Sequence, residues 1–381
     1  MKIGIVGNYG NDNNGDEAIL QSIIEQVKAA FSVPSENITV FSNNTLQTAA
    51  QYGVKSYPLY YRKSNLYKTF YTTYRLNRQY VSEFDLLIIG GGGILMDFYR
   101  REAHLYGTYA MMAQSTKVPY IIYGCGAGPL DTMTGKLMIR YMCKGADSVS
   151  VRDPESKQLL EQIGVKKDII VIGDPAFTLH KPKEQHAETP IKIGMSAVPV
   201  YNANYWPSGD MKKYEAYVEG VAKNLDTILE NHNAHITFFA TKYPQDVSAT
   251  KDIQKVMKYA ERTSIVDENL KPDALMDIAS EQDVIIGTRL HSLIIATNSE
   301  TPIIGISYHV KVNDFMKLID AYDRCFSIEA IEADATVLNK AFTKMKDNWT
   351  NVVEETKQTS LRFHKAALGG KELMVKAVKG K

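Results

Sequence analysis

The sequence predicts an α/β protein built from two Rossmann-like, doubly wound domains. Short runs of β-favouring residues alternate with amphipathic helical segments along most of the 381 residues, and this cycle starts at residue 2 and again at residue 192. Glycine clusters and charged residues follow several of the predicted strands. In an open parallel sheet such residues gather at the carboxyl ends of the strands, where ligands bind.

The first domain, expected over residues 1–182, begins with a strand at residues 2–6, a polar loop containing Asn14-Gly15-Asp16, and a helix from about Asp16 to Ala30. Asp16 and Glu17 lie in the first turn of this helix and stabilise it through its dipole. They also make the helix end less attractive to anions, so a hydroxyl-bearing ligand such as a sugar suits it better. The loop lacks the Gly-x-Gly-x-x-Gly spacing of a dinucleotide fingerprint, which argues against a nicotinamide cofactor.

A basic, tyrosine-rich segment follows at residues 56–80. It contains seven tyrosines, five Lys or Arg, and no Asp or Glu. Tyr67, Tyr71 and Tyr74 have helical spacing, and Ser64 is the expected helix cap. Two interpretations stay open: the helix rests on an anionic membrane surface or holds a lipid-linked substrate, or its tyrosines pack on the sheet.

The rest of the first domain repeats a strand followed by glycines. A buried strand at residues 85–89 leads into Gly90 to Gly93 and then Asp97, and a second strand leads into the turn at residues 124–129. Glycines in these turns allow a ligand to approach the backbone closely. A strand at 148–151 precedes Arg152, Pro154 starts a helix that runs to about Gly164, and a strand at 169–172 closes the domain.

A polar stretch with two prolines, residues 180–190, is the expected linker to a second domain over residues 190–345. This domain has expected helices at about 214–232 and 273–280, and strands at 192–196, 234–240, 283–287 and 302–306. The strand at 283–287 leads into Thr288-Arg289-Leu290-His291 at the start of another helix. Helix amides and a cation at a strand's carboxyl end favour an anionic ligand.

A C-terminal helical region, residues 346–381 with helical pattern from about residue 338, is expected to pack across both domains. Two such domains facing one cleft make the GT-B-like arrangement of many glycosyltransferases.

The composition predicts a soluble, cytoplasmic protein without a metal or bound cofactor. A net charge of +1 gives no general attraction to nucleic acid. Cys125, Cys143 and Cys325 are too widely spaced for a zinc site or a disulfide framework. No apolar run reaches the roughly 18 residues of a membrane span, and the N-terminus resembles a strand rather than a signal peptide. Any membrane contact is therefore expected to be peripheral, at the inner face, through residues 56–80.

Taken in order, the motifs resemble the polysaccharide pyruvyl transferase family. The resemblance covers about residues 1–320 and rests on Asn14-Gly15-Asp16, residues 85–93, residues 124–129, Val151-Arg152-Asp153, Gly173-Asp174-Pro175, residues 287–291, and Tyr308 followed by Lys311. Members of the family move the enolpyruvyl group of phosphoenolpyruvate onto a sugar as a pyruvate ketal and release phosphate. The resemblance thus implies a role in cell-surface or exopolysaccharide biosynthesis, with phosphoenolpyruvate as co-substrate.

The resemblance carries over four catalytic residues: Arg152, Arg289, His291 and Lys311. Phosphoenolpyruvate has a carboxylate and a phosphate, and arginine binds both groups through paired hydrogen bonds. We therefore expect Arg152 from the first domain, and Arg289 and Lys311 from the second, to bind the donor. His291 is expected to act as general acid or base, whereas His309 is expected to be structural.

A second set of residues is expected to bind the substrates: Asn14, Asp16, Gly91, Gly92, Asp97 and Tyr308. Either Asp16 or Asp97 could accept a proton from a sugar hydroxyl, and helix capping or loop bracing are equally open roles for them. The acceptor sugar, and whether it is lipid-linked, stay open.

Two other functions fit the same fold. Sugar-nucleotide-dependent glycosyltransferases usually place an acidic residue on the second-domain helix to bind the ribose, but residues 292–299 contain no Asp or Glu. A non-catalytic carbohydrate-binding relative is the second alternative, and the presence of His291 beside Arg289 argues against it.

Overall fold

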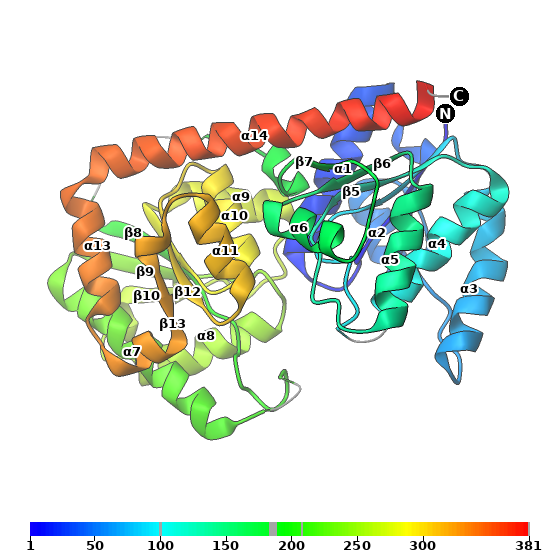
Figure 1. Cartoon of the computed structure of the whole chain (residues 1–381). Helices are drawn as coiled ribbons and strands as arrows, with labels where there is room; N and C mark the ends of the chain where they lie inside the picture. The colour runs from blue at the N-terminus through cyan, green and yellow to red at the C-terminus, as the bar shows by residue number, and fades with distance from the viewer. Residues whose placement is uncertain (99–100, 183–188, 207–208, 380–381) are drawn as a thin grey trace. The chain divides into compact units, whose positions relative to one another are not determined.

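The computed structural model describes residues 1–98, 101–182, 189–206 and 209–379, and these form two compact units. Unit 1 comprises Met1–Asn11, Asp16–Thr178 and Phe363–Lys381, and unit 2 comprises Asp12–Gly15 and Leu179–Arg362. The predicted fold class is confirmed, because each unit is an α/β unit around a parallel sheet (Figure 1).

Unit 1 contains a seven-stranded sheet in the order β3-β2-β1-β4-β5-β6-β7. Its strands are β1 (Ile3–Val6), β2 (Ile38–Ser42), β3 (Lys55–Pro58), β4 (Leu86–Gly90), β5 (Tyr120–Cys125), β6 (Ser148–Val151) and β7 (Ile169–Val171). Its helices are α1 (Asn14–Phe31), α2 (Thr45–Tyr52), α3 (Leu66–Val81), α4 (Glu102–Thr116), α5 (Met133–Gly145) and α6 (Pro154–Gln162). The central strands are buried on both faces, which explains their nearly continuous runs of Ile, Val and Leu.

The helices of unit 1 cover the two faces of its sheet. α3, α4 and α5 pack over one face around a shared apolar core. The other face is covered by α1 and the C-terminal part of α14 (Trp349–Lys379). There the Tyr123 hydroxyl donates to Gln26 of α1 at 2.6 Å. A Cβ on Gly370 of α14 would come within 2.1 Å of that hydroxyl, so the helix can approach only with a glycine at this position.

Unit 2 contains a six-stranded parallel sheet in the order β10-β9-β8-β11-β12-β13. Its strands are β8 (Ile191–Ser196), β9 (Ala234–Phe238), β10 (Thr263–Ile265), β11 (Val284–Gly287), β12 (Ile303–Ser307) and β13 (Cys325–Ser327). Its helices are α7 (Met211–Asn231), α8 (Gln245–Val256), α9 (Pro272–Glu281), α10 (Leu290–Asn298), α11 (Val310–Leu318), α12 (Ile328–Ala333), α13 (Val337–Asp347) and the first part of α14.

Unit 2 also includes the short segment Asp12–Gly15, which the sequence analysis placed in the first domain. The backbone NH of Asn14 donates to the Thr241 carbonyl at 2.9 Å, and the NH of Tyr243 donates to the Asp12 carbonyl at 3.1 Å. These two bonds join the segment to the loop that follows β9.

Some expected boundaries differ from the structure. The cap of α3 is Asn65, whose side chain accepts from the NH of Lys68, rather than Ser64. The C-terminal helical region is two helices, because α13 ends at Asp347 and α14 starts at Trp349. Part of the expected linker, residues 183–188, lies outside the described residues. Among the described helices, none combines the length and the apolar character that crossing a membrane requires.

Candidate functional site

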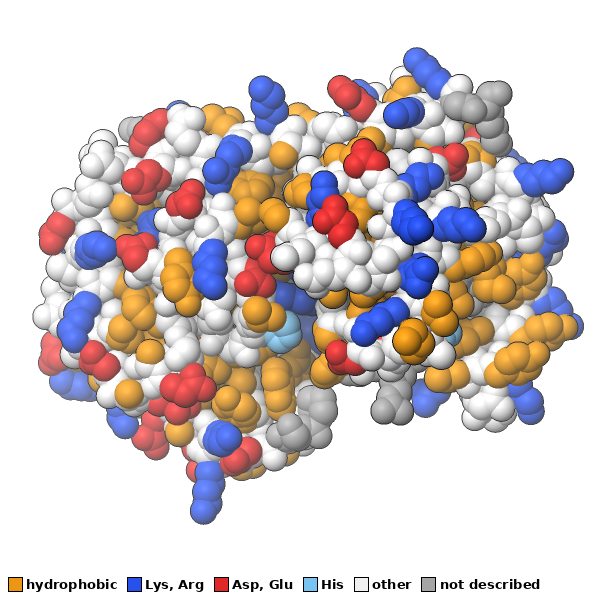
Figure 2. All heavy atoms as spheres, in the orientation of Figure 1, with side chains coloured by type: hydrophobic (Ala, Val, Ile, Leu, Met, Phe, Trp, Pro, Cys, Tyr) orange, Lys and Arg blue, Asp and Glu red, His pale blue; other side chains and the backbone are white. Residues whose placement is uncertain are grey.

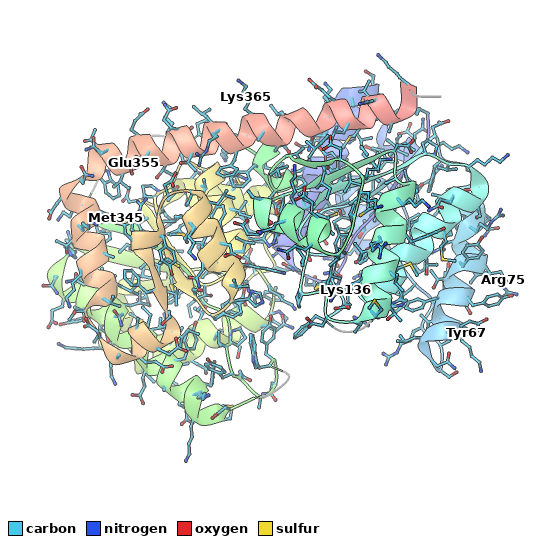
Figure 3. The ribbon with its side chains drawn as sticks, in the orientation of Figure 1. Tyr67, Arg75, Lys136, Met345, Glu355 and Lys365 are labelled. Carbon is cyan, nitrogen blue, oxygen red and sulfur yellow. The ribbon has the colours of Figure 1, made fainter. Side chains whose placement is uncertain are left out.

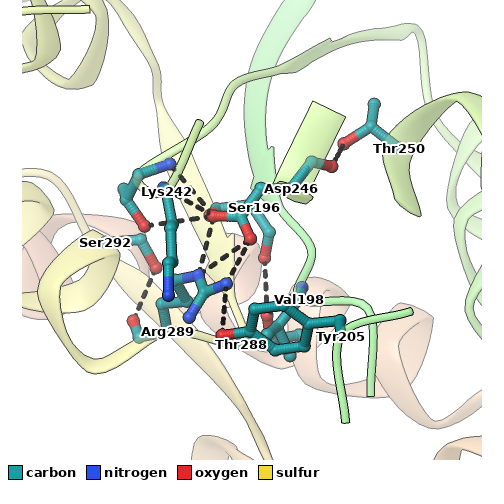
Figure 4. A network of polar contacts seen from close by, with 10 residues as sticks. Ser196, Val198, Tyr205, Lys242, Asp246, Thr250, Thr288, Arg289 and Ser292 are labelled. Atoms are coloured by element: carbon teal, nitrogen blue, oxygen red, sulfur yellow. Dashed lines mark hydrogen bonds and ion pairs between the residues drawn. The ribbon is translucent and has the colours of Figure 1, made fainter. Parts of the chain in front are cut away.

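In unit 2, the strand order makes the carboxyl ends of β8 and β11 the candidate ligand site. These strands are neighbours although the chain visits β9 and β10 between them, so the sheet's connections change direction here, and ligands of open parallel sheets bind at such a point. Thr288 ties the two strand ends together (Figure 4). Its hydroxyl donates to the Ser196 carbonyl at 3.0 Å and accepts from the NH of Val198 at 2.8 Å. The next residue, Arg289, therefore starts from a fixed backbone position.

The Arg289 side chain is held by Asp246, a residue that the sequence analysis did not select. Its Nε donates to Asp246 Oδ2 at 2.7 Å, and its Nη2 donates to Asp246 Oδ1 and, at 3.2 Å, to the Tyr205 hydroxyl (Figure 4). Asp246 is fully buried and also accepts from the backbone NH of Lys242 at 2.8 Å. Burial alone would lower the pKa of Arg289, but the charge of Asp246 and its hydrogen bonds outweigh burial and raise it. The guanidinium is thus permanently charged and fixed in direction.

Aromatic rings line this part of unit 2. The Tyr205 ring centroid is 5.2 Å from Lys242 Nζ and 5.6 Å from Arg289 Cζ, which are cation–π distances. Trp206 contacts Tyr205 on one side and, edge to face at 5.8 Å, the expected substrate-binding residue Tyr308 on the other. Because sugars bind aromatic faces through their apolar C–H surfaces, this group of rings adds a candidate sugar-contacting surface next to Arg289.

His291 lies in the first turn of α10 and packs against Gly15 of the N-terminal segment. A Cβ on Gly15 would come within 2.3 Å of both Cγ and Nδ1 of the imidazole ring. A glycine is therefore required for the segment to lie against the ring. Asn14 anchors the same segment, because its side-chain amide donates to Asn269 Oδ1 at 3.2 Å. The structure thus brings Asn14, Gly15 and His291 together in one unit, and substrate binding by Asn14 stays a prediction.

Lys311 is the second residue of α11, two positions after His309. The His309 side chain caps this helix by accepting from the backbone NH of Lys311 at 3.2 Å, which confirms its expected structural role. Burial, and secondly the charge of Lys311, lower the pKa of His309. A neutral imidazole is the form that can cap a helix through Nδ1, so the two observations agree.

In unit 1, the corresponding change of direction lies between β1 and β4. Asp16 follows β1 and accepts from the Asn8 side chain at 2.9 Å. Gly91 and Gly92 follow β4 with positive φ angles of 78° and 69°, and a Cβ on Gly92 would come within 2.9 Å of Asp16 Oδ1. Burial is the main reason that the pKa of Asp16 is raised to about 7. A buried carboxyl group that titrates near neutrality is typical of proton-transfer sites.

Arg152, at the end of β6, is buried between two carboxylates. Its Nε donates to Asp153 at 3.1 Å and its Nη1 to Asp174 at 3.3 Å. The guanidinium lies over Gly126, where a Cβ would come within 2.8 Å of Nε. The glycine-rich turn after β5 is thus needed to accommodate Arg152, and the Gly173-Asp174-Pro175 motif supplies one of its partners.

The Asp97 carboxylate braces a loop, which is one of the roles that the sequence left open for it. One oxygen accepts from the NH of Asp131 at 2.8 Å, and the other accepts from the NH and hydroxyl of Thr132 at 2.7 and 2.6 Å. Although burial raises its pKa, the bonds from Thr132 and Asp131 outweigh burial and lower it. Thr132 is the cap of α5, so Asp97 holds the start of that helix and is a poor proton acceptor. These bonds favour the bracing role over proton transfer, and substrate binding by Asp97 stays a prediction.

Comparisons with known proteins agree on family and fold. The family model described as polysaccharide pyruvyl transferase matches residues 13–310. The chain is also similar to the amylovoran biosynthesis protein AmsJ of Erwinia amylovora, with 20% identity over 396 residues that cover 93% of this chain and 94% of AmsJ.

Solved structures with a similar fold include a protein in complex with UDP-glucose, a glycosyltransferase and a putative epimerase. HepE of Anabaena, in complex with UDP-glucose, has a TM-score of 0.64 at 10% identity over 100% of both chains. A glycosyltransferase from Rickettsia africae has a TM-score of 0.62 at 12% identity, over 99% of this chain and 98% of its own. A putative UDP-N-acetylglucosamine 2-epimerase from Listeria monocytogenes has a TM-score of 0.62 at 10% identity, over 96% of this chain and 91% of its own. At these identities the likeness shows the GT-B-like fold.

Proposed function

Because the chain belongs to the polysaccharide pyruvyl transferase family, we propose that it transfers the enolpyruvyl group of phosphoenolpyruvate to a sugar as a pyruvate ketal, in cell-surface or exopolysaccharide biosynthesis. The observation that carries this proposal is the fixed guanidinium of Arg289 two residues before His291, at the direction change of the unit 2 sheet. The similarity to AmsJ, named for amylovoran biosynthesis, supports an acceptor sugar that becomes part of a polysaccharide.

Donor binding is assigned to the cationic groups of unit 2. Asp246 engages Nε and Nη2 of Arg289, so we assign the Nη1 edge to an oxygen of the donor. A hydrogen bond between charged groups contributes roughly 1.5–3 kcal/mol. The Arg289–Asp246 pair is neutral as a whole, so the net attraction for a multiply charged anion has to come from further cations. Lys311 and Lys242 supply that charge, and Lys242 is a candidate that sequence reasoning missed.

Arg152 of unit 1 is proposed to take part in the same reaction, on the basis of its place in the family motif. Its ion pairs with Asp153 and Asp174 fix its direction as Asp246 fixes that of Arg289. Two neighbouring carboxylates also reduce its attraction for anions. We therefore assign Arg152 to positioning a reactant and leave neutralisation of the donor's negative charge to the lysines of unit 2.

Ketal formation requires two proton transfers. Two sugar hydroxyls add to the substituted alkene carbon of phosphoenolpyruvate and lose two protons. One proton ends on the methylene carbon, which becomes a methyl group, and the other leaves with inorganic phosphate. We propose that His291 serves one of these transfers. Asp16, with its pKa near 7, is the carboxyl group that we propose for hydroxyl deprotonation.

The decisive experiment is release of inorganic phosphate from phosphoenolpyruvate with a panel of free and lipid-linked sugar acceptors. We expect release only with an acceptor, together with a gain by that acceptor of one pyruvate ketal in mass spectrometry. UDP-glucose serves as the alternative donor, because HepE binds it on a similar fold. Sugar transfer from UDP-glucose, with no reaction of phosphoenolpyruvate, would replace the proposal by a sugar-nucleotide glycosyltransferase.

The His291→Ala variant separates catalysis from carbohydrate binding alone. We expect turnover to fall by at least about a hundredfold, because a positioned acid or base typically contributes 10²–10⁴-fold. Binding of phosphoenolpyruvate, measured by calorimetry, should persist because Arg289 remains. Full activity in this variant would remove the proposed role of His291.

A further inference from the structure

Three neighbouring helices of unit 1 present an unusual outer surface. α4 lies between α3 and α5: Phe70 of α3 stacks on His104 of α4 with ring centroids 6.3 Å apart, and Met138 of α5 sits directly over Gly107 of α4. α4 thus packs against both outer helices, α3 on one side and α5 on the other. We call the outward side of α3, α4 and α5 the three-helix face.

Large apolar side chains are concentrated on this face. Seven of the eighteen exposed large hydrophobic side chains among the described residues belong to these three helices. They are Leu66, Tyr67, Tyr71, Met111, Met133, Leu137 and Tyr141. Tyr67 and Met133 are 79% and 71% exposed, which shows that these side chains project into solvent instead of packing in the core.

Six of the seven tyrosines in the tyrosine-rich segment therefore fall into two groups. Tyr57, Tyr60, Tyr74 and Tyr80 pack against the core of unit 1, as the packing interpretation expected. Tyr67 and Tyr71 stack on each other on the outside of α3 with ring centroids 6.5 Å apart. Figure 3 shows Tyr67 and Arg75 projecting from α3 away from the sheet, and Lys136 projecting from α5.

The charge of the three-helix face is of one sign. α3 and α5 contain six Lys or Arg and neither Asp nor Glu. Lys68 and Arg75 on α3, and Arg140 and Lys144 on α5, are exposed. The single acidic residue of α4, Glu102, is 8% exposed and pairs with Arg101. In Figure 2 hydrophobic and basic side chains gather over α3 and α5, while acidic side chains concentrate elsewhere on the visible face.

From this combination we infer that the three-helix face docks on an anionic lipid surface. Lys and Arg are attracted to anionic headgroups, and the exposed Leu, Met and Tyr side chains enter the interfacial layer, where Tyr is favoured. Charge alone would equally suit a nucleic acid or another soluble polyanion. The protruding aliphatic side chains favour lipid, because a polyanion offers them no apolar environment. The all-basic character opposes a symmetric contact with a second copy, which would set like charges against each other.

The test is flotation of the full chain with vesicles of neutral phosphatidylcholine and with vesicles that contain anionic phosphatidylglycerol. We expect binding to the anionic vesicles alone, with a loss at high salt because exposed charges are screened. Two charge-reversal variants, Lys68→Glu/Arg75→Glu on α3 and Arg140→Glu/Lys144→Glu on α5, should each weaken partitioning at least about tenfold. Tyr67→Ser/Leu137→Ser keeps the charges and should weaken binding as well, because the apolar contribution is lost.

The matched control is Lys365→Glu/Lys376→Glu, which reverses two exposed charges on α14 of the same unit. It should bind the anionic vesicles as the unaltered chain does. Absence of binding, or equal losses in the control and the α3 and α5 variants, would overturn the inference. Heparin binding that is insensitive to Tyr67→Ser/Leu137→Ser would identify a polyanion site instead. A concentration-dependent dimer that the same substitutions disrupt would identify an interface between copies.

Discussion

At the scale of single residues, the two arginines proposed for the reaction are each held by a buried carboxylate, Asp246 for Arg289 and Asp174 for Arg152. Arg289 pairs with Asp246 and Arg152 with Asp153 and Asp174. A buried carboxylate reduces the charge of the pair, but it fixes the guanidinium in a direction that solvent would otherwise randomise. Such pre-organisation favours a reaction in which charge moves during turnover.

Removal of the Asp246 charge is predicted to separate stability from activity. Asp246→Asn leaves the charged, largely enclosed Arg289 side chain without its partner, and breaking such a pair typically costs about 3–5 kcal/mol of unfolding free energy. Adding Arg289→Gln should restore most of that stability, measured by urea denaturation, without restoring turnover. A double variant that stays as unstable as Asp246→Asn would show that Asp246 stabilises the fold mainly by accepting the hydrogen bond from the backbone NH of Lys242.

Asp16 is predicted to make stability depend on pH. Its pKa is about 7 in the folded protein and near 3.8 in the unfolded chain, so between these values the folded state holds a proton that the unfolded state has released. Stability therefore falls as pH rises from about 4 to 7. In Asp16→Asn the difference in unfolding free energy between pH 5 and pH 8 should shrink by on the order of a few kcal/mol.

Asp97→Asn is the control for this experiment. The pKa of Asp97 is lowered in the folded protein, so its contribution to stability is lost only at acid pH, below this window. It should destabilise the protein by the same amount at pH 5 and pH 8. An unchanged pH dependence in Asp16→Asn would contradict the raised pKa of Asp16.

At the scale of elements, the segment Asp12–Gly15 shapes the surroundings of His291. Gly15→Ala introduces a Cβ within 2.3 Å of a rigid imidazole ring, so the ring or the segment has to shift. Because displacement of a catalytic group by about 1 Å costs on the order of a hundredfold, we expect a comparable loss of acceptor-dependent phosphate release. Gly369→Ala on α14 is the control, since nothing lies within 4 Å of the added Cβ. Normal activity in Gly15→Ala would show that the ring tolerates displacement.

At the scale of the whole molecule, a single helix belongs to both units. α14 contributes to unit 2 up to Arg362 and to unit 1 from Phe363 onward. Phe363 is 8% exposed and stacks on Phe177 with ring centroids 4.8 Å apart. Phe363→Ala should therefore lower the unfolding free energy by about 3 kcal/mol. Leu361→Ala, at an exposed neighbouring position, is the control and should change the unfolding free energy by less than about 1 kcal/mol. Both values are measured by calorimetry, and equal losses in the two variants would show that α14 adds little to the core of unit 1.

Sequence patterns predicted those features that depend on local periodicity and on the order of motifs along the chain. Alternating strands and helices predicted two parallel sheets, because a strand–helix–strand repeat permits few other arrangements. The motif order predicted the family and placed Arg289 and His291 after one strand, since residues that follow a strand directly stay at its end.

Tertiary structure decided which distant groups meet those residues. Asp246 lies 43 positions before Arg289 in sequence. The two meet because β9 and β11 both pair with β8, so the segments that follow these two strands lie close together at one edge of the sheet. Sequence alone also left Asp97 between two roles and the tyrosines between core and surface. Such questions depend on the burial and the hydrogen-bond partners of each side chain. Both follow from the order of strands in the sheet and from which face of each helix packs against it, and no local sequence pattern encodes these.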